Sequence, residues 1–306
     1  MIVLWGIHGD EPMDLVRDAL DRLNYNYVLV DQQNVCLTSM NMNVGKTVSG
    51  WIKTPSSVIN LESVTAVYLR PYDSRKMSAV QHESEGSSLW LHALSLEDAM
   101  WTWIEITPAL VVNRPTVAIS NNSKPHQAKL IRAAGLRVPD TLVTTDIEAV
   151  KEFWKLHGEI IYKSVSGVRS IVSRLSEDHR SRLDTIANCP TQFQEYIPGN
   201  DWRVHVVGDK VFSCEVLSNA DDYRYPSRSG EVVQVVSRDL SEELKNDCLR
   251  LSKMLHLPLC GIDLRCTPQG DWYCFEVNPS PGFSYYEQVT GQPIADTIAR
   301  FLAGEQ

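Results

Sequence analysis

Gly261-Ile262-Asp263-Leu264-Arg265 and Cys274-Phe275-Glu276-Val277-Asn278-Pro279-Ser280-Pro281-Gly282 are the two segments that decide the fold of this chain. Each begins as a short strand pattern in which polar and apolar residues alternate, and a polar turn joins them. As neighbouring antiparallel strands they place Asp263 across from Glu276. Glu276 and Asn278 are two residues apart and therefore point to the same face of the sheet.

Three oxygen-bearing side chains thus converge: Asp263, Glu276 and Asn278. Two neighbouring carboxylates repel each other unless a cation lies between them, and oxygen-only donors suit Mg²⁺, whose coordination is completed by water and phosphate oxygens. A polar strand pair that faces solvent is the alternative interpretation. Apolar residues between the polar ones predict a buried opposite face, which favours a cleft. These apolar residues are Ile262, Leu264, Phe275 and Val277.

Basic side chains form a second group of candidates. They are Lys124, Lys163, Arg203 and Arg224. Lys163 ends the apolar strand pattern 160–162, and a loop of small residues follows at 164–170. This loop includes Ser166 and Gly167, and its backbone N–H groups could approach phosphates. The segment is neither a Walker A sequence nor a GxGxxG loop. Alone, a lysine at a strand end is more often an ordinary solvated charge.

A third candidate is the strand end Gln194-Glu195-Tyr196-Ile197-Pro198-Gly199. The backbone N–H and C=O groups of such a segment could bind the edge of an adenine while its apolar side chains cover the faces of the base. Alone, the pattern is also that of a common strand end.

The composition is that of a folded protein with a local anion site. The chain has 306 residues, 43% of them hydrophobic and 22% charged, which predicts about two globular domains. A net charge of −9 argues against a general attraction to nucleic acid or to anionic membranes. The sequence has no transmembrane stretch or signal peptide, so we expect a cytoplasmic protein. The seven cysteines contain no C-x-x-C pair and are expected to be free thiols.

The domain boundary is expected near residue 112. Residues 1–112 alternate short apolar strand patterns with helical ones, which predicts a small parallel α/β sheet with a Rossmann-like arrangement. Strand patterns and hairpin signals dominate residues 113–306, which predicts an α+β arrangement. They include a helix pattern from about Pro125 to Ala134 that ends at Gly135 and a hairpin signal at Gly208-Asp209. The elements expected before the boundary are strands at 2–7, 27–30, 64–69 and 110–112 and helices at 13–23 and 87–106.

The order of these motifs resembles the ATP-grasp superfamily from Asn113 to about Leu302. In chain order the similar segments are 122–127, 135–141, 163–170, 194–197, 201–209, 261–278 and 287–295. The last of them is similar to the RimK-type C-terminus. The resemblance implies an ATP-grasp fold preceded by a pre-ATP-grasp domain. It implies phosphate binding by Lys124, Lys163, Ser166 and Gly167, adenine binding by Gln194, Glu195, Tyr196 and Ile197, and Mg²⁺ (or Mn²⁺) binding by Asp263, Glu276 and Asn278.

Within the superfamily, two short segments resemble the graspetide, or microviridin-type, peptide maturases. They are Val211 to Ser218, followed by Asp222-Tyr223-Arg224. Ahead of residue 113 only Ala66 to Pro71 is similar to that group. Glu215, within the first segment, is a candidate for orienting Arg224, with a structural ion pair as the alternative.

The resemblance implies an ATP-dependent ligase that joins a carboxylate to an amine or hydroxyl through an acyl phosphate. Arg203 and Arg224 are then the candidate catalytic residues, and a peptide or amino acid is the expected substrate. Two alternatives remain open. One is a small-metabolite, dipeptide-type ligase whose N-terminal domain holds an amino acid, with Arg70 or His8 as anchors. The other is a non-catalytic ATP-binding regulatory protein. Association with a second copy of the chain is also left open.

Overall fold

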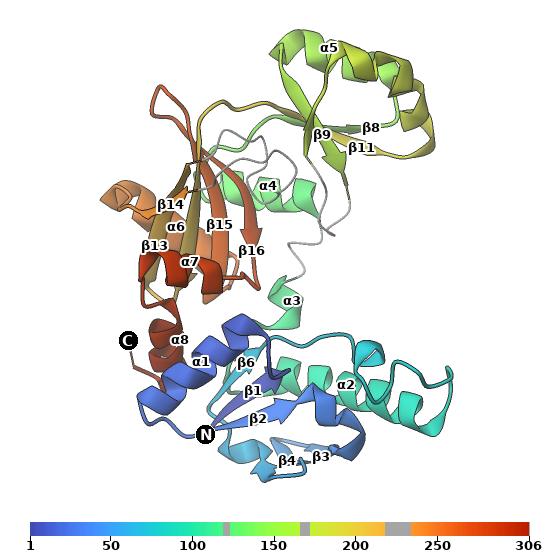
Figure 1. Ribbon diagram of the computed structural model, residues 1–306, viewed down its shortest axis with the longest axis vertical. Coiled ribbons are helices and arrows are strands. Elements are labelled where there is room, and N and C mark those ends of the chain that lie inside the picture. The colour runs from blue at the N-terminus through green and yellow to red at the C-terminus, as the bar shows by residue number, and fades with distance from the viewer. Residues whose placement is uncertain (119–122, 166–171, 218–233, 306) are drawn as a thin grey trace.

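The computed structural model describes residues 1–118, 123–165, 172–217 and 234–305. Ser166, Gly167 and Arg224, which the sequence singles out, lie outside these ranges. Figure 1 shows three bodies: a parallel sheet at the N-terminal end, a small lobe around α5, and a larger antiparallel sheet near the C-terminal end. Among the described residues, no helix has both the length and the apolar composition that crossing a membrane requires.

The N-terminal sheet is four-stranded and parallel, in the order β2-β1-β6-β7, which confirms the predicted α/β class. Successive residues of β1 face opposite sides: Ile2 and Leu4 pack with α1, whereas Val3 and Trp5 pack with α2. The bounds are β1 Ile2–Gly6, α1 Glu11–Arg22, β2 Tyr27–Asp31, β6 Ala66–Leu69, α2 Ser88–Ile106 and β7 Leu110–Val112.

A second, three-stranded antiparallel sheet lies in the same part of the chain and was not predicted. It is formed by β3 Ser39–Val44, β4 Val48–Lys53 and β5 Val58–Asn60. β3 and β5 contain three Asn residues and β4 contains Gly50, residue types that are depleted in strands, so the sheet becomes evident only from cross-strand pairing. Short 3₁₀ segments complete the region, at Gln32–Leu37, Leu61–Ser63 and Ser74–Lys76.

The end of the chain returns to the N-terminal sheet. α7 (Ser284–Thr290) and α8 (Ile294–Ala303) follow the last strand, and α8 lies beside α1 (Figure 1). Ile294, Ile298 and Leu302 of α8 are buried in one core with α1 and β1. The boundary near residue 112 stays a prediction, and the C-terminal helices share their core with the residues before it.

The central lobe is an antiparallel sheet in the order β10-β9-β11-β8, covered by α5 and by the 3₁₀ stretch Glu177–Asn188. Its bounds are β8 Thr141–Thr144, α5 Ile147–His157, β9 Ile160–Ser164, β10 Ser173–Arg174 and β11 Thr191–Glu195. Before it come α3 (Pro115–Ala118) and α4 (Lys124–Ala133). Gly135 follows α4 with φ +91°, the left-handed conformation that the predicted helix end requires.

The C-terminal sheet has five antiparallel strands in the order β14-β13-β12-β15-β16. Its bounds are β12 Asn200–Val207, β13 Lys210–Leu217, β14 Gln234–Ser237, α6 Glu242–Met254, β15 Leu259–Cys266 and β16 Trp272–Asn278. One face packs on α4 and α6 through a core that includes Ile131, Leu251 and Ile262. The opposite face of β12, β15 and β16 is left for polar residues. The predicted hairpin at Gly208-Asp209 is confirmed, with Val207 paired to Lys210.

Candidate active site

A cleft that is open to solvent lies between the central lobe and the C-terminal sheet. We call its two sides the central wall, formed by β9 and β11, and the C-terminal wall, formed by β12, β15 and β16. Most of the candidates predicted from the sequence meet here. The lining residues among them are Lys124, Lys163, Gln194, Glu195, Tyr196, Ile197, Asp263 and Glu276.

The paired carboxylates lie where the sequence predicts them. Asp263 of β15 is the cross-strand partner of Glu276 of β16. Asn278 lies two residues further along β16, opposite Gly261, and its Oδ1 accepts a hydrogen bond of 2.9 Å from the N–H of Ser280. The structure therefore brings the two carboxylates together at the cleft, with the amide beside them at the end of the strand.

One detail of this strand pair differs from the prediction. The register between β15 and β16 shifts at Asp263 and Leu264, because a β-bulge leaves Phe275 without a cross-strand partner. The alternation expected from the sequence put Phe275 on the buried face with Val277. The bulge turns Phe275 into the lining of the cleft instead, where it is half-buried.

Each carboxylate is held by a cation. Arg203 Nη1 donates to Asp263 Oδ1 at 2.5 Å, and the Arg203 side chain is only 8% exposed. Lys124 Nζ lies 3.8 Å from Glu276 Oε2. This hard, oxygen-only donor set, with cations close enough to balance its charge, fits a magnesium ion together with phosphate oxygens.

The central wall contributes a buried lysine. Lys163 of β9 is 8% exposed, and its Nζ donates to Gln194 Oε1 of β11 at 3.2 Å. Gln194 in turn donates through Nε2 to the hydroxyl of Thr141 at 3.0 Å. The ammonium group of Lys163 therefore contacts the side-chain amide of the neighbouring strand.

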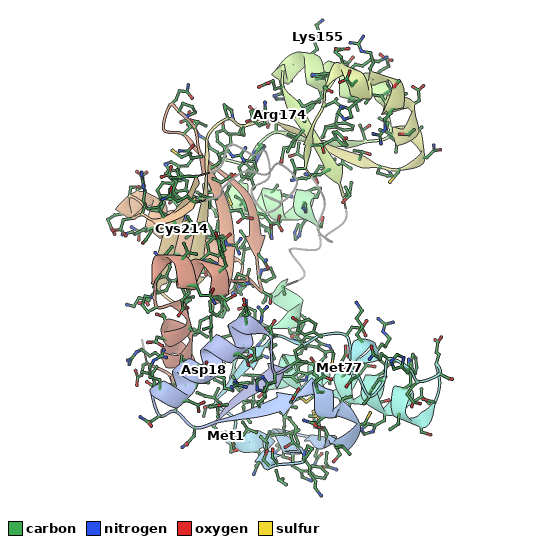
Figure 2. The ribbon with its side chains drawn as sticks, viewed as in Figure 1. Met1, Asp18, Met77, Lys155, Arg174 and Cys214 are labelled. Carbon is green, nitrogen blue, oxygen red and sulfur yellow. The ribbon has the colours of Figure 1, made fainter. Side chains whose placement is uncertain are left out.

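The predicted adenine segment lines the cleft at the junction of the two walls. The carboxylate of Glu195 points away, because it accepts a hydrogen bond from the N–H of Asp140. Arg174 of β10 is labelled at the edge of the central lobe in Figure 2, and its guanidinium carbon lies 3.9 Å from the ring centroid of Tyr196. Ile197 is buried, so this segment offers backbone groups and apolar surface to the cleft.

The sequence reasoning missed a second ion pair in the C-terminal wall. Arg265 donates to both carboxylate oxygens of Asp201, at 2.8 and 3.0 Å, and to the carbonyl oxygen of Ile197 at 2.9 Å. Its guanidinium also lies 5.2 Å from the centroid of the Phe275 ring. The signal was present, because two D-x-R sequences, 201–203 and 263–265, occupy neighbouring antiparallel strands. Their antiparallel pairing places Asp201 opposite Arg265 and Arg203 opposite Asp263.

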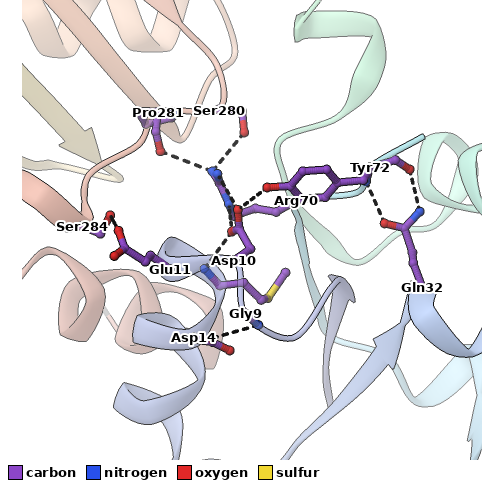
Figure 3. A network of polar contacts seen from close by, with 11 residues as sticks. Gly9, Asp10, Glu11, Asp14, Gln32, Arg70, Tyr72, Ser280, Pro281 and Ser284 are labelled. Atoms are coloured by element: carbon purple, nitrogen blue, oxygen red, sulfur yellow. Dashed lines mark hydrogen bonds and ion pairs between the residues drawn. The ribbon is translucent and has the colours of Figure 1, made fainter. Parts of the chain in front are cut away.

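A polar network ties the N-terminal sheet to the loop that follows Asn278 (Figure 3). Arg70 forms an ion pair with Asp10 and donates to Ser280 Oγ at 3.2 Å and to the Pro281 carbonyl at 3.3 Å. The Tyr72 hydroxyl also donates to Asp10, at 2.8 Å. Burial acts to raise the pKa of Asp10, but Arg70, Tyr72 and a backbone N–H together outweigh it and lower the pKa.

Two side chains that the sequence singled out, Arg70 and Glu215, are engaged within the protein. Arg70, a candidate anchor for an amino acid, has a side chain only 14% exposed and is engaged within the protein. Glu215, a candidate partner of Arg224, accepts from Asn200 Nδ2 at 2.7 Å and pairs with Arg238 at 3.0 Å. The structural ion pair named as the alternative for Glu215 is therefore present.

Comparisons with known proteins agree with this geometry. Residues 121–302 match the model of the RimK-like ATP-grasp domain. A probable alpha-L-glutamate ligase of Shewanella loihica is 28% identical over 209 residues, covering 65% of this chain and 68% of its own.

Two solved structures share the fold along nearly the whole chain, which confirms the predicted ATP-grasp architecture. The macrocyclase MdnC of Microcystis aeruginosa, bound with precursor peptide MdnA, has a TM-score of 0.82, 22% identity and 98% coverage of both chains. The ATP-grasp ligase PsnB, complexed with a minimal precursor, Mg and ADP, has a TM-score of 0.76 and 27% identity, covering 99% of this chain and 97% of its own. The chain belongs to the RimK-like ATP-grasp family, whose members are ligases that use ATP and Mg²⁺.

Proposed function

We propose that the chain joins a carboxylate of a peptide to an amine or hydroxyl group, with ATP as the energy source. The observation that carries this proposal is the cleft itself, in which Lys163 of the central wall faces Asp263 and Glu276 of the C-terminal wall. Polyphosphate binding to a chain of net charge −9 requires a local concentration of cations, which Lys124, Lys163 and a magnesium ion on the two carboxylates would supply. MdnC and PsnB were solved with precursor peptides, which supports a peptide substrate.

In this proposal each wall has its own task. The segment Gln194 to Ile197 binds the adenine through backbone groups, and the ammonium groups of Lys124 and Lys163 bind phosphate oxygens. Asp263, Glu276 and Asn278 would hold Mg²⁺, which when bound neutralises phosphate charge and orients the transferring group. Ser166, Gly167 and Arg224 stay predictions for the phosphate loop and the substrate side.

The reaction then needs no nucleophile from the protein. The substrate carboxylate attacks the γ-phosphorus, ADP leaves, and an acyl phosphate forms. The amine or hydroxyl attacks the acyl carbon, phosphate leaves, and one proton is released. Arg203, which donates a hydrogen bond to Asp263, would stabilise the charge that develops on the transferring phosphoryl group.

The domain assignment belongs to this proposal. Residues 1–112 form the pre-ATP-grasp domain and residues 113–306 the ATP-grasp domain, with the cleft inside the second. A cytoplasmic location and association with a second copy of the chain stay predictions.

A second candidate is a ligase of free amino acids, because the curated relative is named a probable alpha-L-glutamate ligase. The test incubates the protein with ATP, Mg²⁺ and a mixed pool of peptides and amino acids, followed by measurement of ADP and mass spectrometry of the products. Peptides that lose one water per bond, or that gain an amino acid at a carboxylate, support the main proposal, and amino acids joined only to each other support the second. Both proposals are contradicted if ADP forms at the same rate without peptides or amino acids, or if no ADP forms when they are added.

Lys163→Ala and Glu276→Ala provide the site controls for this test. Each variant removes one charged group from one wall, so each should lower ADP formation by about 100-fold or more. A folded variant of either kind that turns over like the wild type would remove that residue from the proposed site.

A further inference from the structure

His205 is a buried ionisable residue that the proposed reaction does not use. It is 1% exposed on β12, two residues after Arg203, so both side chains point to the same face of the strand. The Nε–H of Arg203 lies 3.3 Å from Nε2 of His205. A guanidinium can only donate, so Nε2 must be the unprotonated nitrogen of the ring.

The other side of the ring lies beside the backbone of Gly282, in the loop just after Asn278. Burial, together with the charge of Arg203, lowers the pKa of His205 well below its ordinary value, although the Gly282 backbone opposes this. The imidazole is therefore neutral, with its proton on Nδ1, and it links the arginine to the loop at the end of β16.

The surroundings leave the arginine little freedom. The ring of Tyr286, on α7, lies 5.1 Å from the ring of His205 and 5.7 Å from the Arg203 guanidinium carbon. Gly261 is the cross-strand partner of His205, and a Cβ there would overlap the guanidinium of Arg203. The guanidinium thus fills the space that a side chain at position 261 would occupy.

We infer that His205 is a positioning residue that holds the Arg203 guanidinium against Asp263 and couples it to the Gly282 loop. Its Nε2 takes up one N–H of the guanidinium, Asp263 takes up another at 2.5 Å, and Gly261 leaves the necessary space. These contacts fix the orientation of the guanidinium beside Asp263, which lines the cleft. This inference rests on the role of Arg203 in the proposed function.

Two variants separate the two contacts of the ring. His205→Gln places an amide oxygen near the position of Nε2 and keeps an acceptor for Arg203. His205→Asn is too short to reach Arg203 and keeps only a donor near the position of Nδ1. If the role of His205 were purely structural, the affinity of these variants for Mg·AMPPNP would not depend on whether they keep an acceptor for Arg203. Gly261→Ala displaces the guanidinium from the other side, and Arg203→Lys tests the arginine itself.

The readout on the wild-type protein is the ring state, from ¹⁵N spectra of histidine-labelled protein, with the resonance assigned by its loss in His205→Gln. We expect a neutral ring with its proton on Nδ1. A proton on Nε2, or a doubly protonated ring, would overturn the inference even if the variants fail to fold.

The second readout is calorimetric affinity for Mg·AMPPNP, with thermal unfolding as the check on folding. We expect about tenfold weaker binding for His205→Asn, Gly261→Ala and Arg203→Lys, and a change of less than about threefold for His205→Gln. If folded His205→Asn binds Mg·AMPPNP like the wild type while Arg203→Lys binds it weakly, the inference is overturned and the proposed function is unaffected. Wild-type binding by Arg203→Lys overturns the role of Arg203, and the inference with it.

Discussion

In the C-terminal wall of the cleft each arginine is held by a carboxylate of the neighbouring strand, whereas in the central wall Lys163 is held by the neutral amide of Gln194. The C-terminal wall is further anchored to the N-terminal sheet through Arg70 and Asp10. The difference teaches that the two walls should respond differently to substitution. A change in the C-terminal wall leaves a buried charge without its partner, whereas a change at Lys163 removes the charge itself.

The largest effect is expected at Asp263. Asp263→Asn keeps the shape of the side chain but removes the charge that pairs with Arg203. We expect a loss of about 2 to 3 kcal/mol in the free energy of unfolding, because the arginine is buried. ADP formation should fall by about 100-fold or more. Urea unfolding and an ADP-release assay measure the two effects.

Asp201→Asn is the matched control for Asp263→Asn. It breaks the other ion pair of the same wall, whose carboxylate is outside the proposed magnesium ligands. The control should lose similar stability with a smaller loss of turnover. Equal turnover in the two variants would contradict the assignment of Asp263 to the metal.

The next largest effect tests the central wall. Lys163→Met removes the ammonium, and the amide of Gln194 carries no charge that this change would expose. The free energy of unfolding should therefore change by less than about 1 kcal/mol, while affinity for Mg·AMPPNP falls about tenfold. Destabilisation as large as that of Asp263→Asn would remove the contrast between the walls.

A smaller effect is expected at Arg265. Arg265→Lys keeps the positive charge but loses the two-pronged contact with Asp201 and the bond to the Ile197 carbonyl. Nucleotide affinity should fall about five- to tenfold, or roughly 1 kcal/mol, with little change in kcat. Calorimetry with Mg·AMPPNP measures the first and steady-state kinetics the second. A loss confined to kcat would place Arg265 with the reacting groups instead.

The smallest effect concerns the anchor to the N-terminal sheet. The folded-state pKa of Asp10 is lowered from 3.8, so its contribution is fully present above that value and is lost as the pH falls through the lowered pKa. Asp10→Asn should cost about 1 to 2 kcal/mol at pH 7 and progressively less below pH 3.8. Unfolding curves of both proteins at several pH values test this, and a difference independent of pH would refute it.

Much of the fold could be predicted because short-range sequence patterns determine many of its elements. The strands on either side of α1, the helix ending before Gly135, and the hairpin at Gly208 all carry short-range signals. The sheet of β3 to β5 could not be predicted in this way, because its strands are weakly apolar and their pairing depends on contacts beyond each segment.

The same distinction between local signals and long-range contacts applies to the residues of the active site. Asp263 and Glu276 were placed correctly because strand pairing follows from their spacing. Phe275 was placed on the wrong face because one bulge reverses the alternation beyond it. The Asp201–Arg265 pair and the bond from Arg203 to His205 were missed, because each depends on which side chains share a face after the sheet has formed.

The most direct test of the cleft is a crystal structure of the protein with Mg·AMPPNP. The account predicts the triphosphate between Lys124 and Lys163, the adenine against residues 194–197, and the metal ion on Asp263, Glu276 and Asn278. A nucleotide bound elsewhere, or a metal ion without contact to either carboxylate, would contradict it.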